Sequence, residues 1–434
     1  MRSVKKGLLP VIVASMLPAA VTAQTLEESI VSSLKNNPEI GIALNRSLAR
    51  QESIGVARSG NLPSIDLQAG YGYENSDNST TRVTGDHSKD LTRQELSVNL
   101  RQMLFDGFRT DSDVKRASAE ALADQYQLQN TAENLALRAV EVYLESLNAE
   151  KIKALSEKNL ASHEKIRDQI QLRTESGIGS SSDLSQVEGR LARANSNLVA
   201  ADNNIQDAVA NFFRVVGETP HQLEPLDTLS AQLPEGVVQA EETALSKHPV
   251  ILAAIEDVRA TAEKVRFEES ANYPQVSFEL GASANHDLDG SEAHESDLTA
   301  MFRVNYNLYS GGRIKHSVQQ ASAEQAQAKD VQRNASRQIV EGLNLAWNAY
   351  RALSDQLKYL DIHVEESRKT LTAYTKQFEL GRRSLMDLLD TENELFEAEK
   401  AFLNAEKDWI FAQYRVLNAT GQLLSALEID HSVQ

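Results

Sequence analysis

The stretch "LFDGFR", Leu104 to Arg109, and its counterpart "LYSGGR", Leu308 to Arg313, each join a strand-like pattern to a long helix-like pattern. Paired glycines beside a basic residue also suggest a phosphate-binding loop. Such a loop needs a further glycine spacing and a Lys-Ser/Thr pair, which both stretches lack. A chain that passes from extended to helical conformation within a few residues favours glycine. We therefore expect Gly107, Gly311 and Gly312 to form strand-to-helix turns.

Both stretches belong to an internal duplication that covers most of the chain. Pro63 aligns with Pro274 at an offset of 211 residues, and Gly177 aligns with Gly381 at an offset of 204. A period this long exceeds the roughly 20–50 residues of solenoid repeats. The sequence therefore predicts two copies of one large unit. The units are expected at residues 24–225 and 226–434.

Each unit is expected to contain an opening helix, two strands, a very long helix and a final short helix. Ile65, Leu67 and Ala69 alternate with the polar residues Ser64 and Asp66, which is typical of a strand with one apolar face. The same alternation recurs in three further segments. Strands are predicted at about 62–76, 91–105, 273–286 and 297–310, and opening helices at about 26–59 and 239–271.

The long helical segments set the size of the molecule. Neither glycine nor proline occurs between Asp111 and Ser176. Sixty or so helical residues make a rod of about 100 Å, which does not fit inside a compact globule. Apolar residues such as Val140, Tyr143 and Leu147 keep the spacing of a coiled-coil seam, although the seam is rich in alanine. We therefore expect these rods to pack lengthwise against other helices.

The N-terminus has the pattern of an export signal. Three basic residues precede an apolar run over residues 7–17, and small residues follow at 21–23. This pattern predicts a cleaved signal peptide over residues 1–23. The alternative is an uncleaved anchor helix, for which the apolar run is too short. Cleavage removes three positive charges and takes the formal net charge from −18 to −21.

The composition argues against several classes of function. There are 44 basic and 62 acidic residues, so the basic surface of a nucleic-acid-binding protein is missing. Without cysteine, the chain has no disulfide, thiolate zinc site or thiol nucleophile. The nine histidines form no metal-binding motif, and no nucleophile-elbow sequence is present. We therefore expect no enzyme activity, metal or cofactor.

The strands cannot form a closed structure within one chain. If their apolar face contacts lipid, every backbone polar group needs a partner, because hydrocarbon offers no water. Membrane barrels have at least about eight strands, and one chain supplies four. More than one copy must then contribute to a single barrel. The alternative is a small soluble sheet with one buried face, which the strand pattern alone does not exclude.

In this context the chain resembles the TolC family of outer-membrane channel proteins. The resemblance rests on "LPSIDLQAGYGY" from Leu62, on the two glycine stretches, on "FELGRRSLMDLLDTENEL" from Phe378 and on the two-fold repeat. It implies a mixed α and β fold: a homotrimer with a transmembrane β-barrel, four strands per chain and twelve in all. It also implies a long α-helical coiled-coil barrel that continues the β-barrel into the periplasm.

The resemblance also implies a function. The protein would be the outer-membrane exit duct of a tripartite export system, opened by a periplasmic adaptor and an inner-membrane ABC transporter or proton-driven pump. The stretches "LPSIDLQAGYGY" and "LRQMLFDGFR" look closest to members that serve type I secretion of a large protein, such as an adhesin. The alternatives are multidrug efflux and, from another class, a soluble periplasmic coiled-coil scaffold. Membrane lipid is an expected partner.

Two carboxylates are candidates for an aperture. Asp387 and Asp390 lie three residues apart and share one helix face. In a trimer they would form two acidic rings, which attract cations. In the family, the matching aspartates form the constriction at the periplasmic tip. Ser384 and Asp387 also fit a helix-capping box, which offers a structural reason for Asp387 but not for Asp390.

The resemblance further implies links that hold the closed state. By position these fall on four residues of the two hairpins: Arg383, Asp183, Ser182 and Phe378. Arg383 and Asp183 would form a charge-assisted pair. The family usually has a tyrosine where this chain has Phe378, so one hydrogen bond of the lock is missing. Gly177 and Gly381 are expected to break the helices near the periplasmic tip.

Overall fold

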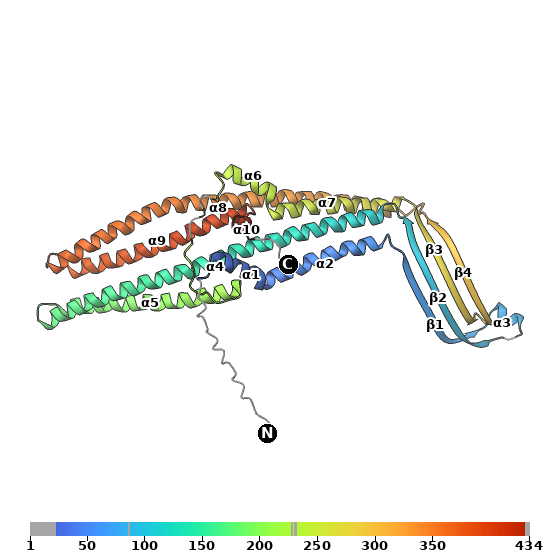
Figure 1. Cartoon of the computed structure of the whole chain (residues 1–434), viewed down its shortest axis with the longest axis horizontal. Helices are drawn as coiled ribbons and strands as arrows, with labels where there is room; N and C mark the ends of the chain where they lie inside the picture. Colours follow the sequence, from blue (N-terminus) through green and yellow to red (C-terminus); the bar gives the residue numbers. More distant parts are fainter. Residues whose placement is uncertain (1–22, 86, 227–228, 230–231, 430–434) are drawn as a thin grey trace, which may run out of the picture.

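A computed structural model describes residues 23–85, 87–226, 229 and 232–429. The expected signal peptide therefore lies outside the described residues, except for its last position. The molecule is elongated, with a β-sheet at one end and the tips of two helical hairpins at the other (Figure 1). Among the described helices, none combines the length and the apolar character needed to cross a membrane.

Four strands form one antiparallel sheet in the order β1-β2-β3-β4. Their bounds are β1 (Ser64–Ser76), β2 (Lys89–Phe105), β3 (Gln275–Leu288) and β4 (Ser291–Asn305). The two hairpins have the same register. Ser64 lies opposite Arg101 in the first hairpin, and the equivalent residues Gln275 and Asn305 lie opposite each other in the second. The duplication seen in the sequence is therefore repeated in the pairing of the strands.

The fourth strand differs from the prediction of about 297–310. A tight turn at Gly290, with φ of +84°, lets Leu288 pair with Ser291, so the polar residues after the turn are already in the strand. At its other end, Asn305 lies opposite Gln275, the first residue of β3. Residues 306–310 therefore have no partner strand among the residues that the structure describes.

The polar loop between β1 and β2 contains a short helix, α3 (Ser79–Val83), which Asn78 caps. This loop contacts the turn between β3 and β4. The side-chain amide of Asn78 donates to the carbonyl of Asp289 at 2.8 Å, and the carboxylate of Glu74 accepts from the backbone N–H of Gly290 at 3.1 Å. The ends of the two strand hairpins are thus tied together.

The opening segments, each expected to be one helix, are both broken in two. The four helices are α1 (Leu26–Asn36), α2 (Pro38–Ser59), α6 (Val237–Lys247) and α7 (Pro249–Glu269); a 3-10 turn, η1 (Ser270–Asn272), follows α7. Proline lacks the N–H that a continuous helix needs but fits the first helical position. Asn37 and His248 therefore cap the second helix of each pair, accepting from the backbone N–H of Glu39 and Val250.

The long helices have the expected length. Helices α4 (Arg109–Glu175) and α8 (Arg313–Glu379) contain 67 residues each, or about 100 Å. The helices that end the two units were expected to be short, but α5 (Ser181–Val216) has 36 residues and α9 (Leu385–Ala419) has 35. A four-residue helix, α10 (Leu423–Ala426), follows α9.

Helices α5 and α9 pack against the long helices through a heptad of small residues. The buried positions recur every seven residues, and the two series are equivalent at the offset of 204: Val187, Ala194, Ala201, Ala208 and Val215 in α5, and Thr391, Ala398, Ala405 and Ala412 in α9. A seven-residue repeat produces a coiled-coil seam. Alanine at this seam allows the helices of each hairpin to approach closely.

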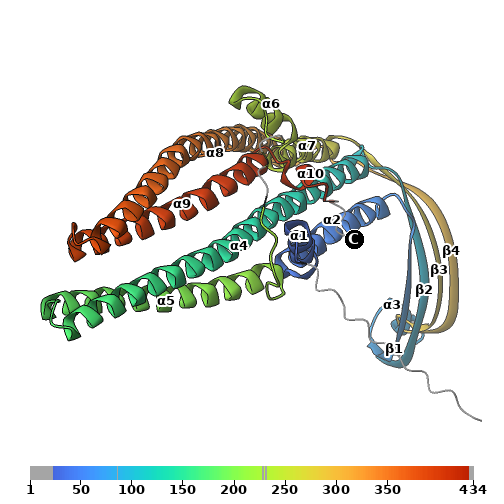
Figure 2. The same cartoon turned by 60° about the vertical axis from the view of Figure 1, so that its left-hand side comes forward.

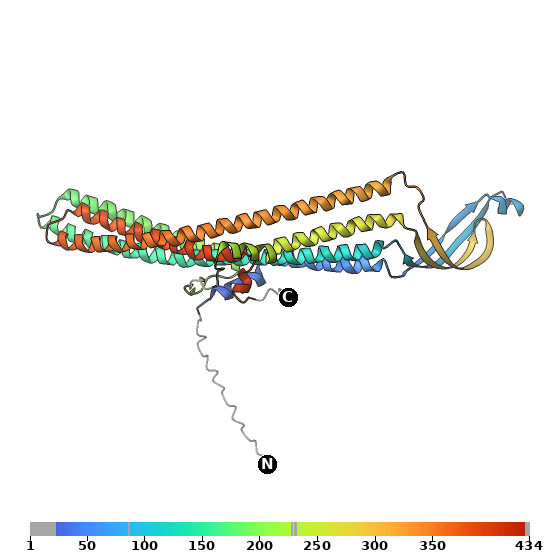
Figure 3. The same ribbon diagram turned by 90° about the horizontal axis from the view of Figure 1, so that it is seen from above.

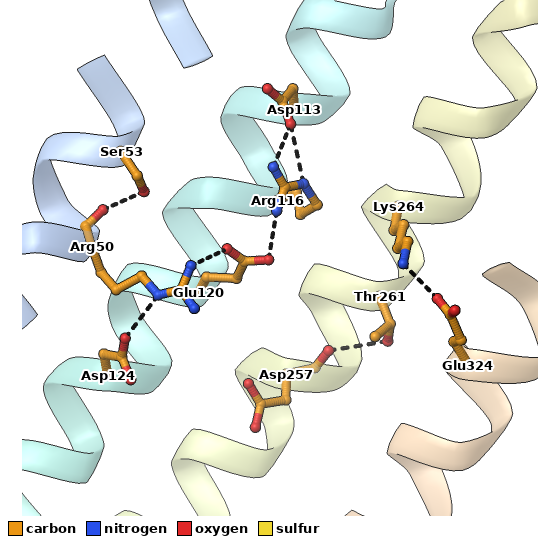
Figure 4. A network of polar contacts seen from close by, with 10 residues as sticks. All are labelled: Arg50, Ser53, Asp113, Arg116, Glu120, Asp124, Asp257, Thr261, Lys264 and Glu324. Carbon is orange, nitrogen blue, oxygen red and sulfur yellow. Dashed lines mark hydrogen bonds and ion pairs between the residues drawn. The ribbon is translucent and has the colours of Figure 1, made fainter. Parts of the chain in front are cut away.

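Helices α2, α4, α7 and α8 continue the sheet in the same order as its strands (Figure 3). Ion pairs join neighbouring helices there (Figure 4). Arg50 of α2 contacts Asp124 and Glu120 of α4, both at 3.1 Å, and Lys264 of α7 contacts Glu324 of α8 at 2.6 Å. Glu120 and Glu324 are equivalent in the two repeats, so each unit ties its long helix to the preceding helix through the same carboxylate.

The main apolar core lies midway along the molecule, where α1, α4, α5, α9 and α10 meet. Its largest side chains include Tyr143 and Phe212, which are fully buried with ring centroids 6.5 Å apart. The core therefore holds the two hairpins together at their base. It leaves the sheet and the hairpin tips at opposite ends of the molecule.

The glycines of the two opening stretches lie at the turns between strand and helix. Gly107, Gly311 and Gly312 have φ of +72°, +63° and +87°. Phe108 occupies the position of Gly312 in the first repeat and has φ of +67°, which is unusual for a bulky residue. Its ring packs edge-on against the ring of Tyr273, with 6.3 Å between the two ring centroids, and this packing helps to hold the turn.

Candidate functional site

The tips of the two hairpins lie at the same end of the molecule, opposite the sheet (Figure 2). Helix α4 ends before Gly177, with φ of +75°, and α8 ends before Gly381, with φ of +70°. In the second turn, the N–H of Arg382 donates to the carbonyl of Gln377 at 2.8 Å. A glycine in the left-handed region is the usual way to end a helix. Both glycines thus lie where the chain reverses direction.

The first aperture candidate, Asp387, is also part of a helix cap. Its backbone N–H donates to the hydroxyl of Ser384 at 3.2 Å, and its carboxylate lies 3.6 Å from Arg383. The hydrogen bond with the Ser384 side chain and, to a smaller extent, the charge of Arg383 lower the pKa of Asp387. This carboxylate therefore stays ionised at neutral pH, as an acidic ring requires.

The second candidate, Asp390, has a partner that the sequence analysis missed. Arg190 of α5 donates to the Asp390 carboxylate of α9, with 2.7 Å between Nη2 and Oδ1. One turn further along, Arg193 lies 3.8 Å from Glu397. The repeat aligns Asp390 with Gln186, one helical turn from Arg190. Arg190, a basic residue on the equivalent helix, was therefore the sequence signal from which this ion pair could have been predicted.

The expected pair of Arg383 with Asp183 is not formed within one chain. The guanidinium of Arg383 donates to the side chain of Gln377 at 3.0 Å and lies 4.1 Å from the ring centroid of Tyr374. For Asp183, which the structure describes, no ion pair is present within 4.0 Å. Within one chain, Arg383 is held by its own hairpin through the stack on Tyr374 and the hydrogen bond to Gln377.

Ser182 makes only local contacts. Its backbone N–H donates to the hydroxyl of Ser180 at 3.1 Å, and the two hydroxyl oxygens lie 2.7 Å apart. This arrangement caps α5, with Ser180 as the capping residue. Among the described residues, Ser182 therefore has no hydrogen bond that crosses to the second hairpin.

Phe378 does join the hairpins, but through packing. Its side chain is 5% exposed, and the guanidinium carbon of Arg173 from α4 lies 4.8 Å from its ring centroid. The surrounding apolar cluster draws on α4, α5 and α9 and consists of Ile166, Ile170, Val187, Leu385, Leu388 and Leu389. A cation near an aromatic face is attracted to it. Packing thus joins the hairpins at the position where the family usually has a tyrosine.

This arrangement combines weak and strong links. Exposed ion pairs contribute about 0.2–1 kcal/mol each, so Arg190 with Asp390 can separate at small cost. The cluster around Phe378 is buried and contributes more. No group of three or more His, Asp or Glu residues that could hold a metal ion occurs in the described part of the chain. The two hairpins of one chain are therefore joined at their tips by an exposed ion pair and by a buried apolar cluster.

Comparisons with known proteins agree with this architecture. The chain matches the family "Outer membrane efflux protein" over residues 29–218 and 241–422, one segment in each repeat. It is 28% identical over 409 residues to the outer membrane efflux protein BepC of Brucella suis, covering 93% of this chain and 87% of BepC. It is 25% identical over 432 residues to outer membrane protein TolC of Vibrio cholerae, covering 96% of each.

Two further similarities complete the comparison. The proteases secretion protein PrtF of Dickeya chrysanthemi is 23% identical over 439 residues, covering 96% of this chain and 93% of PrtF. The crystal structure of the Campylobacter jejuni CmeC outer membrane channel has the same fold, with a TM-score of 0.80 at 16% identity over 94% of this chain and 90% of CmeC. The predicted resemblance to the TolC family is thereby confirmed, and the soluble scaffold is excluded. The chain belongs to the outer membrane efflux protein family, whose members are outer-membrane channel proteins and not enzymes.

Proposed function

We propose that three copies of the chain form one exit duct across the outer membrane. The observation that carries this proposal is the sheet: four strands with an apolar face and two open edges. An open edge in hydrocarbon leaves roughly five unpaired backbone groups and costs tens of kcal/mol. Three copies supply twelve strands, enough for a closed barrel. The helices would then continue the duct into the periplasm.

The duct serves a tripartite system with a periplasmic adaptor and an inner-membrane transporter. For the cargo we favour a large protein, exported by type I secretion with an ABC transporter. Two observations support this choice: the stretches "LPSIDLQAGYGY" and "LRQMLFDGFR", and the similarity to a protein named for the secretion of proteases.

A second candidate is the outer-membrane component of a multidrug efflux pump. The similarity to BepC, which is named an efflux protein, favours it. In this case the inner-membrane partner would be a proton-driven pump and the cargo a small molecule. Both candidates use the same duct, so they differ in partner and cargo only.

At the periplasmic tip, Asp387 and Asp390 would line the aperture of the resting duct. The links of Phe378 and of Arg190 with Asp390 would hold each subunit's hairpins together. Because Arg383 does not reach Asp183 within one chain, this pair would join neighbouring subunits. Ser182, beside Asp183, would lie at the same contact.

Two experiments test the proposed function. The mature protein should require detergent for extraction, migrate as a heat-sensitive trimer and conduct ions in a planar bilayer; a monomer soluble in buffer contradicts the duct. In a deletion strain, loss of an exported protein with unchanged drug susceptibility supports secretion, and the reverse result supports efflux. For the aperture, Arg383→Ser should raise the single-channel conductance, and an unchanged conductance would count against the intersubunit lock.

A further inference from the structure

The sheet has two edges, β1 and β4, that no other described part of the chain covers. In β1, every residue from Ser64 to Tyr73 is exposed, and in β4 every residue from His294 to Asn305 is exposed. The central strands β2 and β3 have more buried positions. In the trimeric duct proposed above, β4 of one copy must meet β1 of the next. The register of that junction fixes which side chains meet.

The chain contains a template for the missing junction. Strands β2 and β3 join the first repeat to the second, and β4 and β1 of the next copy are their equivalents. In this template Val98 lies opposite Ala282, and Ser97 opposite Ser283. The offsets of 204 for β2 to β4 and 211 for β1 to β3 hold in space as well, because they convert the register of the first hairpin into that of the second.

From this template we infer that β4 pairs with β1 of the neighbouring copy with Phe302 opposite Tyr71. Adding 204 to Val98 gives Phe302, and subtracting 211 from Ala282 gives Tyr71. The same shift continues along the junction. It sets Met301 opposite Gly72, Arg303 opposite Gly70 and Val304 opposite Ala69. The inference rests on the trimeric barrel, and it adds the register that closes it.

The faces of the two strands agree with this register. Phe302 and Tyr71 are both apolar and exposed, at 74% and 80%, and they lie together on the apolar face. On the polar face, the large side chains Met301 and Arg303 each lie opposite a glycine. The template has this feature at one of the two positions: Gly281, the equivalent of Gly70, lies opposite Asn99, and a Cβ at Gly281 would lie 3.0 Å from the Thr299 hydroxyl and 3.1 Å from the Asn99 side chain.

The register also gives a partner to the segment after β4. In β2, Gln102 and Phe105 pair with β3 beyond the point where pairing with β1 stops. Their equivalents, Tyr306 and Tyr309, are 55% and 87% exposed and lie outside the strand in a single chain. In the assembly they lie opposite Leu67 and Ile65 of the next copy. The fourth strand would then extend to about residue 309, close to the sequence-based prediction.

Disulfide crosslinking tests the register, and the absence of natural cysteine makes the background clean. Four double variants use the same four positions in two combinations. The matched pairs are Met301→Cys with Gly72→Cys, and Arg303→Cys with Gly70→Cys. The crossed pairs are Met301→Cys with Gly70→Cys, and Arg303→Cys with Gly72→Cys. At Gly72 an added Cβ meets nothing within 4 Å, and at Gly70 it makes ordinary contacts with Glu95.

In an antiparallel pair, the Cβ atoms of directly opposite residues lie about 4.5–5.5 Å apart, whereas diagonal neighbours lie about 7–8 Å apart. A disulfide needs its two Cα atoms within about 7 Å of each other. Matched pairs should therefore form covalent dimers and trimers on non-reducing gels on the order of tenfold faster than crossed pairs. Ser97→Cys with Ser283→Cys, the equivalent pair within the chain, calibrates the rate. Because all four positions occur in both combinations, a folding defect of one substitution affects both.

The possible results distinguish an error in the proposed register from an error in the proposed duct. Faster crosslinking of the crossed pairs, in a protein that still forms a conducting trimer, overturns the register and leaves the duct intact. No crosslinking between chains, while the Ser97 and Ser283 variants form their disulfide within the chain, overturns pairing of β4 with β1. Loss of the wild-type trimer in detergent contradicts the duct itself.

Discussion

Arg190 of α5 and Asp390 of α9 form an ion pair of 2.7 Å between the two helical hairpins of one chain. The residues are 200 positions apart and belong to different repeats. Asp390 is therefore not a free carboxylate at the tip, unlike the pattern expected from the sequence. Its charge is compensated within its own chain, and the pair contributes to holding the hairpins together.

Breaking this pair should loosen the tip. Arg190→Ser is expected to raise the single-channel conductance. The substitution removes about 0.2–1 kcal/mol of the free energy that stabilises the closed tip, and it leaves Asp390 unpaired. The exchange of charges in Arg190→Asp with Asp390→Arg should restore the wild-type conductance. Arg193→Ser, whose partner lies farther away at 3.8 Å, should have a smaller effect. Equal conductance of Arg190→Ser and wild type would contradict the role of the pair.

Ion selectivity should depend unequally on the two aspartates. Asp387 lies 3.6 Å from Arg383, a longer contact than the 2.7 Å ion pair of Asp390 with Arg190, so the charge of Asp387 is compensated less. Asp387→Asn should therefore reduce cation over anion selectivity more than Asp390→Asn. Reversal potentials in a salt gradient across a planar bilayer measure this directly. If Asp390→Asn has the larger effect, the ion pair does not persist in the assembled duct.

The cluster around Phe378 should stabilise the tip mainly by apolar packing. Phe378→Ala removes a ring that is 95% buried and should cost about 3–5 kcal/mol locally. Phe378→Leu keeps most of the apolar volume and should cost clearly less. The rate of tryptic cleavage at Arg382 and Arg383 reports opening of this turn. Similar cleavage rates for the two variants would show that the volume of the Phe378 ring does not determine the stability of the tip.

Gly107 and Gly311, two of the three strand-to-helix turn glycines, should tolerate alanine differently. Each has positive φ, so alanine costs about 1–2 kcal/mol at either position. At Gly107 the new Cβ would also lie 2.6 Å from the carbonyl oxygen of Ser270, whereas at Gly311 nothing lies within 4 Å. Gly107→Ala should therefore lower the thermal midpoint of the trimer more than Gly311→Ala. The opposite order would contradict the close packing at the first turn.

A buried carboxylate should make stability depend on pH. Glu133 is 3% exposed and accepts hydrogen bonds from the backbone N–H groups of Leu423 and Leu424 at 3.0 and 3.3 Å. Burial raises its pKa from 4.5 to about 7. The folded protein thus binds this proton more tightly than the unfolded chain. Its free energy of unfolding should fall as pH rises from about 4.5 to 7, by at most about 1.4 kcal/mol per pH unit.

Glu133→Gln should remove this dependence, because the amide does not titrate. Unfolding of the helices, followed by circular dichroism at pH 5 and pH 8, measures it. Glu150→Gln, an exposed position on the same helix, serves as the control and should keep the wild-type dependence. If wild type and Glu133→Gln lose the same stability between these pH values, another group is responsible.

Much of the fold could be predicted because its signals are local. The alternation around Leu67 marks a strand with one apolar face, and the lack of glycine and proline after Asp111 marks a long helix. The break at Pro38 was missed, although proline at the first helical position was a readable signal. The early start of β4 was missed because the tight turn at Gly290 brings polar residues into the strand.

The sequence by itself determined the duplication, the strand faces, the helical rods and the turns at Gly107 and Gly381, because periodicity and glycine act on neighbouring residues. Only the tertiary structure decided that Arg190 contacts Asp390 and that Arg383 does not reach Asp183 of its own chain. Such contacts depend on the axial alignment of two packed helices. A shift of one turn moves a side chain by about 5.4 Å, more than the reach of an ion pair. No pattern along a single helix contains that alignment.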